Sequence, residues 1–316
     1  MNILITAIGS MSAKAVIAAL RRANHGVFGC DIYPAEWLYA SRLVDDFSQV
    51  PRADNPTAYL ASINALCDRH KIDLIIPLTD VEVDTLSLHR DKLIPSSTLA
   101  LMSAKSVSLA RDKFSWSQKL SLSADIQPLP TFLLADVPLQ GLRFPVMLKR
   151  RDGRSSEGQR RIETESEFLE QQRRLPGKEW IVQPFLPGEV HVIDLVRSQA
   201  SGECAAVARK ELLRTANGAG LTVEMIADEA LITKATEVAR LLDLNGCINI
   251  EFMRHATGDY LMDINPRFSA GVEFSVMAGY DMIINHLHCF TGRPVQPSTV
   301  VQNAIFTRHY VAEHSS

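Results

Sequence analysis

Residues 247–271, with the sequence CINIEFMRHATGDYLMDINPRFSAG, predict a β-hairpin that carries two facing carboxylates. Two stretches of alternating polarity flank a polar turn at 257–259, where Thr-Gly-Asp is typical of a hairpin. A hairpin that closes at this turn places Glu251 across from Asp263. Like charges on directly opposite residues destabilise a strand pair, so we expect a cation between them.

Side-chain alternation divides this hairpin into two faces. One face is apolar, and the other is predicted to hold Asn249, Glu251, Leu261, Asp263 and Asn265. Mg²⁺ takes oxygen ligands, typically one or two carboxylates together with substrate phosphates. The alternative is a solvated acidic face on an edge hairpin, and the hairpin alone does not separate the two.

The composition is that of an ordinary globular protein with two or three subdomains. The chain has 316 residues, of which 46% are hydrophobic and 22% charged, and its formal net charge is −3. This length is near the upper useful size of a single core. The charge gives no support to a polyanion-binding surface, so nucleic acid is not an expected partner. No apolar run approaches ~20 residues, so no membrane span is expected.

The five cysteines are widely scattered and form no CxxC pair. Their odd number and their spacing argue against a disulfide framework and against a structural zinc site. This pattern fits a reducing compartment, so we expect a cytoplasmic protein.

The first hundred residues alternate strand and helix patterns. Such a βαβ series predicts a parallel, doubly wound sheet with a ligand crevice at its strand ends. A dinucleotide has little support as the ligand, because the first turn holds only Gly9, although Asp31 lies where a ribose-binding acid would. The expected strands span 2–6, 27–31 and 72–78, and the expected helices span 12–23 and 60–70.

A second unit is expected after a single helical pattern at 103–122. Lys149 ends a predicted strand and leads into the loop 150–159, RRDGRSSEGQ, whose small residues let backbone N–H groups approach a phosphate. The alternative is a solvated basic turn, because arginines crowd the segment. Repulsion between these arginines predicts an open, mobile loop in the absence of ligand. Further strands are expected at 144–149, 180–185 and 190–196, and further helices at 163–173 and 230–242.

Two further segments have possible ligand roles. The stretch 181–189 joins two strands by a turn, and its backbone could pair with an adenine edge; taken alone it is only a hairpin. In 208–220, Arg209, Lys210 and Arg214 are candidates to meet a carboxylate or an acyl phosphate. The alternative for these cations is a charged, protected strand edge.

The order of these features resembles the ATP-grasp superfamily, and most of all its carbamoyl-phosphate-synthase-like members, including the pyrrolysine-biosynthesis ligase type. The family's ending E-I-N-P-R is matched by DINPR at 263–267, and its N-[VI]-[QE]-F pattern by NIEF at 249–252. The resemblance covers nearly the whole chain. It implies an amino-terminal Rossmann-like domain followed by a two-lobed α+β ATP-grasp fold. The expected units are 1–100, 101–182 and 183–316.

Carried over by position, the resemblance implies a site for ATP and for Mg²⁺ or Mn²⁺. The implied ATP-binding residues are Lys113, Lys149, Ser155, Ser156, Gly158, Gln183, Phe185, Leu186 and Glu189, with 153–158 as the phosphate lid. The implied metal ligands are Glu251, Asp263 and Asn265. Arg267, Lys149 and Asn265 are implied as catalytic, and Arg214, Arg267, Ser269 and Gly271 as substrate-binding. Asp31 and 77–80 would border the crevice.

Three positions depart from the family pattern. The ribose-binding glutamate normally lies two residues after the glycine, where this chain has Val190, so Glu189 is either a shifted substitute or uninvolved. Asp263 is one methylene shorter than the usual glutamate. The lid is rich in arginine, which suggests an anionic co-substrate or a solvated flap.

The resemblance implies an ATP-dependent ligase that activates a carboxylate as an acyl phosphate and joins it to an amine, releasing ADP and phosphate. Small-molecule carboxylate and amine substrates are expected, without nucleic acid or membrane partners, and the protein could form a homodimer. The alternatives are a non-catalytic ATP-binding module and, with less support, an NAD(P)-dependent oxidoreductase.

Overall fold

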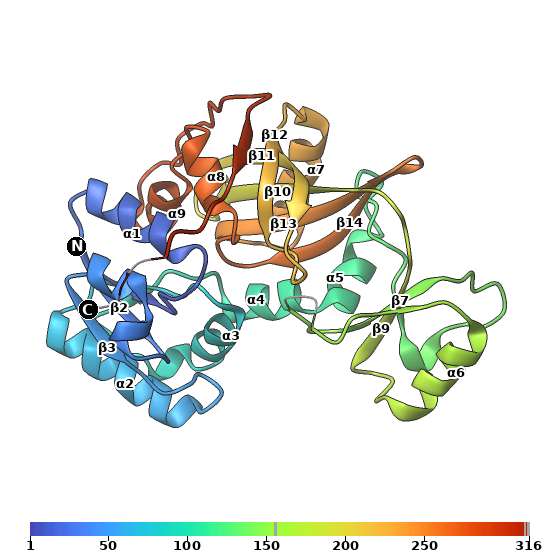
Figure 1. Ribbon diagram of the computed structural model, residues 1–316, viewed down its shortest axis with the longest axis horizontal. Helices are drawn as coiled ribbons and strands as arrows, with labels where there is room; N and C mark the ends of the chain where they lie inside the picture. Colours follow the sequence, from blue (N-terminus) through green and yellow to red (C-terminus); the bar gives the residue numbers. More distant parts are fainter. Residues whose placement is uncertain (155–156, 313, 315–316) are drawn as a thin grey trace.

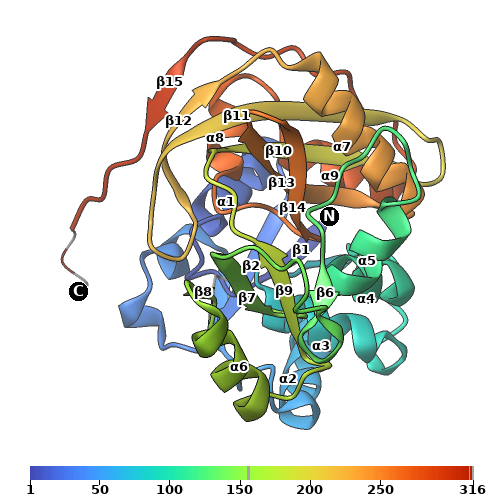
Figure 2. The ribbon, with the colours of Figure 1, turned by 90° about the vertical axis from the view of Figure 1, so that its right-hand side faces the viewer.

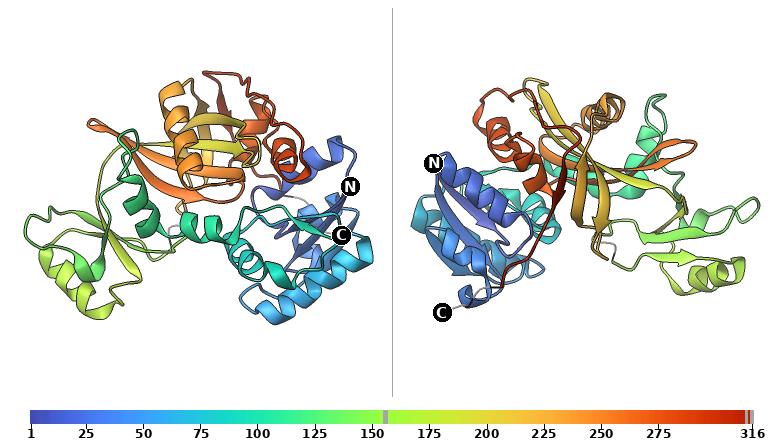
Figure 3. Two further views of the ribbon diagram at one scale, coloured as in Figure 1. Left: turned by 180° about the vertical axis from the view of Figure 1, so that it is seen from behind. Right: turned by 45° about the horizontal axis from the view of Figure 1, so that its top comes forward.

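The computed structural model describes residues 1–154, 157–312 and 314, which form three β-sheets with flanking helices (Figure 1). The chain forms three units: an amino-terminal unit, a small four-stranded unit and a large carboxy-terminal sheet. The helices α4 (Ala104–Arg111) and α5 (Lys113–Leu120) run between the first two units (Figures 1 and 3). Each sheet forms for a different reason, and the three are described in turn.

The amino-terminal sheet is entirely parallel and has the order β3-β2-β1-β4-β5. Its central strands are buried on both faces, as expected of a sheet covered by helices. The doubly wound sheet predicted from the sequence is therefore confirmed. Its elements are β1 (Asn2–Thr6), α1 (Ala13–Arg22), β2 (Gly26–Asp31), β3 (Asp46–Gln49), α2 (Pro56–His70), β4 (Leu74–Ile76), α3 (Asp80–Leu88) and β5 (Thr98–Leu99).

The small antiparallel sheet has the order β6-β9-β7-β8 and packs against α6 (Figure 2). Its buried side chains, including Leu148, Phe168 and Trp180, form a core of their own. The predicted boundary at residue 182 falls inside β9, the second strand of this order. Its elements are β6 (Phe132–Leu133), β7 (Val146–Arg150), β8 (Arg160–Ile162), α6 (Glu165–Arg174) and β9 (Trp180–Pro184).

The large antiparallel sheet has the order β14-β13-β10-β11-β12-β15. Two further cores lie between this sheet and the amino-terminal unit, and each contains side chains from both. These two parts are therefore held together by apolar burial. The elements are β10 (Glu189–Arg197), β11 (Cys204–Arg214), β12 (Gly220–Met225), α7 (Glu229–Leu241), β13 (Gly246–His255), β14 (Gly258–Asn265), α8 (Val272–Met277), α9 (Met282–Thr291) and β15 (Ile305–Thr307).

The helical segment that joins the first two units is broken at Asp112, so the prediction of one helix over 103–122 is wrong. The chain forms α4 (Ala104–Arg111) and α5 (Lys113–Leu120) instead. The Asp112 side chain accepts a hydrogen bond from Ser115 N (3.0 Å), which is N-capping and favours a helix start at this position. Arg151 donates two hydrogen bonds to the same carboxylate, at 2.7 and 2.5 Å.

We predict that Asp112→Ala lowers the free energy of unfolding by about 1–3 kcal/mol, because both the cap and the Arg151 ion pair are lost. Asp112→Asn keeps a capping oxygen and loses only the charge, so its loss of stability should be smaller. Urea denaturation at neutral pH compares the two variants. Equal stability of Asp112→Ala and the wild type would show that the helix break does not depend on this side chain.

Candidate active site

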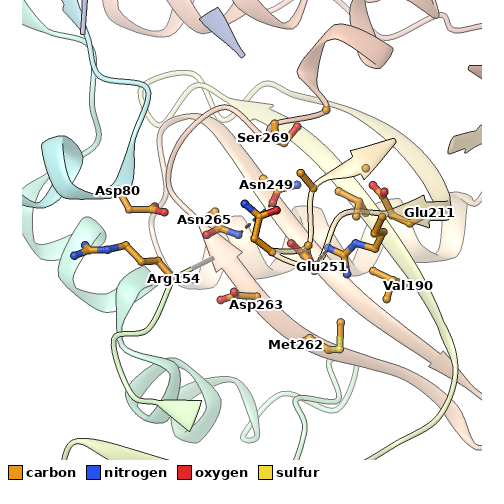
Figure 4. A pocket seen from close by; sticks show the side chains of 18 of the residues that line it. Asp80, Arg154, Val190, Glu211, Asn249, Glu251, Met262, Asp263, Asn265 and Ser269 are labelled. Carbon is orange, nitrogen blue, oxygen red and sulfur yellow. Dashed lines mark hydrogen bonds and ion pairs between the residues drawn. The ribbon is translucent and has the colours of Figure 1, made fainter. Parts of the chain in front are cut away.

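A cavity of about 630 Å³ lies where the three sheets meet. The amino-terminal unit contributes the turns before α1 and α3, the small sheet contributes β7 and its loop, and the large sheet contributes β10, β11, β13 and β14. Figure 4 shows carboxylate, amide and guanidinium groups turned into this space. Ten predicted site residues line the cavity: Lys149, Phe185, Leu186, Arg214, Glu251, Asp263, Asn265, Arg267, Ser269 and Gly271.

The predicted hairpin is present as β13 and β14, and its register confirms that the acids face each other. Glu251 pairs with Asp263, and Asn249 pairs with Asn265. All four side chains line the cavity. The oxygen-rich face predicted from alternation therefore forms part of the cavity wall.

One member of that predicted face was assigned wrongly, because the hairpin contains a bulge. Phe252 pairs with Leu261 while Glu251 pairs with Asp263, so Met262 is an extra residue in β14. The bulge shifts the alternation by one residue. Leu261 is consequently buried in the core, and Met262 lines the cavity beside Asp263.

Each of the two facing acids is already paired with a cation. Lys113 Nζ lies 2.9 Å from Asp263 Oδ1, and Arg214 Nη2 lies 2.8 Å from Glu251 Oε2. These ion pairs compensate the repulsion between the carboxylates. Lys113 itself is only 3% exposed and also donates to the Gly153 carbonyl.

This donor set fits a hard divalent cation that is shared with a phosphorylated ligand. Two carboxylates and the Asn265 amide oxygen supply oxygen ligands of the kind Mg²⁺ prefers. Within the described residues, no group of three or more acidic, histidine or cysteine side chains forms a metal cage. A metal at Glu251 and Asp263 would therefore complete its coordination with ligand oxygens or water.

The amide of Asn265 is oriented by a buried relay that starts at Asp194. Asn249 Nδ2 donates to Asp194 Oδ1, and Asn265 Nδ2 donates to Asn249 Oδ1, both at 3.2 Å. A carboxylate accepts only, so it fixes which end of each amide faces it. The Asn265 oxygen consequently points away from the relay, and it accepts a long hydrogen bond of 3.4 Å from Arg267 Nη2.

Arg267 joins the carboxy-terminal sheet to the amino-terminal unit. Its guanidinium makes two parallel hydrogen bonds of 2.8 Å with Asp80, at the start of α3. Burial raises the pKa of Asp80, but the charge and hydrogen bonds of Arg267 outweigh it and lower the pKa to about 2. Asp80 is thus ionised at neutral pH. Its two hydrogen bonds fix the orientation of the Arg267 guanidinium in the cavity wall.

Lys149 projects from β7 into the same cavity. Burial lowers its pKa to about 8; Asp263 raises the value and Lys113 lowers it. A negatively charged ligand at this position would favour the protonated form. Lys149 can consequently bind an anion, and the bound anion would in turn keep the lysine fully protonated.

The loop after Lys149 contradicts the expected repulsion between its arginines. Arg151 pairs with Asp112, and Arg154 pairs with Asp84 of α3 at 3.1 Å. These two arginines have acidic partners because α3 and the α4–α5 junction present carboxylates to the loop, and Arg150 pairs with Asp152 and Glu179. Ser155 and Ser156, which were predicted to bind phosphate, lie outside the described residues.

The opposite end of the cavity is apolar. Met147, Phe185, Leu186, Met253 and Met262 line it together with Leu129 and two valines. The Arg161 guanidinium lies 4.0 Å from the centroid of the Phe185 ring. A flat apolar ring fits such a surface, and methionine adapts readily to irregular shapes. The methionines were not predicted, because isolated methionines carry no sequence signal for binding.

Four predicted ligand residues do not line the cavity, and one of them is Lys113, described above. Gln183 is buried and donates to Thr131 Oγ1 at 3.0 Å, and Gly158 packs near Trp180. Glu189 is exposed and pairs with Lys210, because alternation along β10 places Val190 and not Glu189 on the cavity side. Asp31 also lies outside the cavity lining. It is buried beneath Gly9, and its Oδ2 accepts a hydrogen bond of 2.8 Å from Gly9 N.

A buried ion network lies behind the loop that follows β14. Arg209 is 2% exposed, and its three nitrogens donate to Asp194 (2.5 Å), Glu211 (3.1 Å) and Ser269 (3.3 Å). A Cβ atom at Gly271 would lie 2.9 Å from Arg209, so glycine permits this close approach. Asp194 and Glu211 were not predicted, although alternation places Glu211 on the same face as Arg209.

Family comparisons match two parts of the chain. The family described as "ATP-grasp in the biosynthetic pathway with Ter operon" matches residues 177–313, and the family described as "PylC-like, N-terminal domain" matches residues 3–98. The chain thus has the ATP-grasp fold, and its residues 177–313 match an ATP-grasp family. Its fold class is that predicted from the sequence, a Rossmann-like domain followed by the two lobes of an ATP-grasp fold.

Solved structures share this ATP-grasp fold at low sequence identity. The biotin carboxylase domain of Hydrogenobacter thermophilus 2-oxoglutarate carboxylase, crystallised with MgADP, ADP and bicarbonate, is 16% identical, with a TM-score of 0.78 over 96% of this chain and 73% of that one. N5-carboxyaminoimidazole synthetase from Staphylococcus aureus, complexed with ADP, is 17% identical. Its TM-score is 0.73, over 97% of this chain and 79% of that one. L-amino acid ligase from Bacillus licheniformis is 14% identical. Its TM-score is 0.70, over 90% of this chain and 73% of that one. No curated protein matches the sequence.

The helices of the described residues include none that is long and apolar enough to cross a membrane.

We predict that Lys149 titrates near pH 8 in the ligand-free protein, and that its pKa responds to its neighbours in opposite directions. Asp263→Asn should lower the Lys149 pKa further, because an attractive charge is lost, whereas Lys113→Met should raise it. NMR titration of ¹³C-labelled lysine side chains measures the shift, and Lys149→Arg assigns the signal. A Lys149 pKa near the ordinary lysine value in all variants would contradict the proposed burial.

Proposed function

We propose that this protein is an ATP-dependent ligase that activates a carboxylate as an acyl phosphate and joins it to an amine, with release of ADP and phosphate. One observation carries the proposal: a single cavity combines an apolar end, several cations and two facing carboxylates. An adenine ring, a chain of phosphates and a phosphate-bound divalent ion require these three environments. The relatives crystallised with ADP or MgADP share the fold that creates this combination.

ATP would bind with its base between Met147, Phe185 and Leu186 at the apolar end. Lys113 and Lys149 would contact the phosphates, and the loop from Gly153 would cover them with backbone N–H groups. Val190, which stands where the family has its ribose-binding glutamate, lines the cavity and has no carboxylate to offer. The base and the phosphates would therefore provide most of the recognition.

Glu251, Asp263 and Asn265 would hold Mg²⁺, which when bound neutralises phosphate charge. The relay from Asp194 keeps the Asn265 oxygen directed for this role, and the cations now on the acids would transfer to the phosphates. Arg267, held by Asp80, would stabilise the transferring phosphoryl group. Catalysis of this kind depends on positioning and on charge stabilisation, without a protein nucleophile.

The chemistry proceeds in two displacements. An oxygen of the substrate carboxylate attacks the γ-phosphorus of ATP, and the bond to the β–γ bridging oxygen breaks, so the electron pair leaves with ADP. The amine nitrogen then attacks the acyl carbon of the acyl phosphate. The carbon–oxygen bond to phosphate breaks, phosphate leaves, and the nitrogen loses a proton.

An oxidoreductase that binds NAD(P) is disfavoured by the first turn of the amino-terminal sheet. Asp31 accepts hydrogen bonds from the N–H groups of Gly9 and Tyr33, so its oxygens are already engaged away from a ribose. A non-catalytic ATP-binding protein would share the nucleotide contacts. Turnover that depends on a second substrate separates that alternative from a ligase.

We also propose a cytoplasmic location and a homodimer. All five cysteines are free, which suits a reducing compartment. The 2-oxoglutarate carboxylase domain of the same fold was crystallised as a dimer. Size-exclusion chromatography with light scattering tests the oligomeric state directly.

We predict that ATP turnover yields ADP and never AMP, because the γ-phosphorus is the site of attack. With hydroxylamine replacing the amine, a panel of small carboxylates should give a hydroxamate from the acyl phosphate. Nucleotide products are separated by ion-exchange chromatography, and the hydroxamate is measured with ferric iron. Stoichiometric AMP and pyrophosphate would overturn the proposed mechanism even if ATP binding were demonstrated.

We predict that Asp263→Asn reduces carboxylate-dependent ADP formation at least ~100-fold at saturating Mg²⁺, the scale for loss of a charge-stabilising group. Asp259→Asn is the matched control, because Asp259 lies on the same strand but pairs with Arg254 outside the cavity. Circular dichroism verifies that both variants are folded. Wild-type turnover of Asp263→Asn would remove this residue from the metal site.

A further inference from the structure

Two polar groups of the cavity wall lack hydrogen-bond partners. Glu211 Oε2 and Arg214 Nε are both buried, and among residues 1–154, 157–312 and 314 neither has a partner. The Glu211 side chain is 2% exposed. A buried polar atom without a partner is costly, so it calls for a specific explanation. One of these atoms only accepts hydrogen bonds, and the other only donates.

Both side chains lie on β11, and both line the cavity because this strand is irregular. Residues three apart on a regular strand face opposite sides. Here the pairing with β12 shifts between Glu211 and Leu213 and again between Leu213 and Arg214. These shifts bring Arg214 to the cavity side, where Glu211 already lies, and they leave Leu213 exposed. Bulges commonly re-aim a side chain next to an active site.

Gly220 shows where the Glu211 carboxylate lies relative to the neighbouring strand. It is the register partner of Arg214 on β12, and a Cβ atom on it would lie 2.3 Å from Glu211 Oε2. The Glu211 carboxylate therefore reaches across to the backbone that faces Arg214. Figure 4 draws Glu211 among the side chains that line the cavity.

The surrounding charges leave Glu211 with unused capacity for a cation. Arg209 is shared between Glu211 Oε1 and Asp194, and Arg214 is paired with Glu251 through Nη2. Burial raises the pKa of Glu211, and the charges of Arg209 and Arg214 offset this only in part. A ligand with a positive group at Oε2 would satisfy the free oxygen and would favour the ionised carboxylate.

We propose that Glu211 and Arg214 bind the head group of an α-amino acid, with its ammonium at Glu211 Oε2 and its carboxylate at Arg214 Nε. A zwitterionic head group carries a donor and an acceptor on one carbon, which matches the two unpartnered atoms. Arg214 contacts Glu251, so a carboxylate bound there lies beside the expected metal ligands. This amino acid is therefore the substrate whose carboxylate is phosphorylated. The inference rests on the ligase function proposed above.

The first test is a panel of the twenty L-amino acids with Mg-ATP and hydroxylamine. At least one amino acid should form a hydroxamate about tenfold or more faster than the same carboxylic acid without its amino group, because the charged contact with Glu211 is then lost. If only acids without an amino group react, the head-group site is wrong and the ligase function stands. If no carboxylate yields ADP, or if AMP is formed, the ligase function itself fails.

The second test removes the charge of Glu211. Glu211→Gln should raise KM for the reactive amino acid by about 10- to 100-fold and abolish its preference over the deaminated acid. The control is Glu224→Gln on neighbouring β12, whose side chain does not line the cavity. A purely structural role of Glu211 would change stability and leave the substrate preference intact.

A third variant keeps the carboxylate but moves it. The methyl group of Gly220→Ala would occupy the space of Glu211 Oε2 and displace that oxygen, so the same preference should be lost. This variant decides the question if Glu211→Gln does not fold. Unchanged preference in a folded Gly220→Ala or Glu211→Gln protein would overturn the proposal.

Discussion

The repulsion between Glu251 and Asp263 is the constraint around which the cavity is organised. Their strands pair in register, so the two carboxylates cannot separate without breaking the hairpin. Coulomb repulsion at this separation is strong inside a protein and must be met by positive charge. Lys113 and Arg214 supply that charge from a helix and from another strand. The acid pair thus draws elements from distant parts of the chain to one point.

The same electrostatic requirement connects the three structural units. Asp80 of the amino-terminal unit holds Arg267, and Asp84 of the same helix holds Arg154 in the loop after β7. Apolar packing joins the first unit to the large sheet, whereas the small sheet has its own core. Polar contacts therefore contribute more to the position of the small sheet than to that of the other two. A charged ligand that replaced one partner in these ion pairs would therefore change how the three units are held relative to one another.

The sequence predicts the parts of this structure that depend on local pattern. Strand alternation and turn composition predicted the hairpin, and the order of motifs predicted the fold. Alternation failed at Leu261, because a bulge changes the register by one residue and has no clear local signature. It also gave no indication that Arg214 and Glu211 share a face. The partners of the lid arginines were missed for a different reason, since they lie far away in the chain and only folding brings them near.

The strand β15 has a consequence for the order in which the protein matures. Arg308, just beyond it, donates to the Ala270 carbonyl at 2.7 Å and lies over the Phe274 ring, so it supports the loop that closes the cavity. Every residue of the cavity wall precedes Arg308 in the chain. During synthesis, domains generally fold as they emerge from the ribosome. The amino-terminal sheet can form early, but a nascent chain that does not yet include Arg308 lacks this support, so the cavity is completed only after β15 has been made.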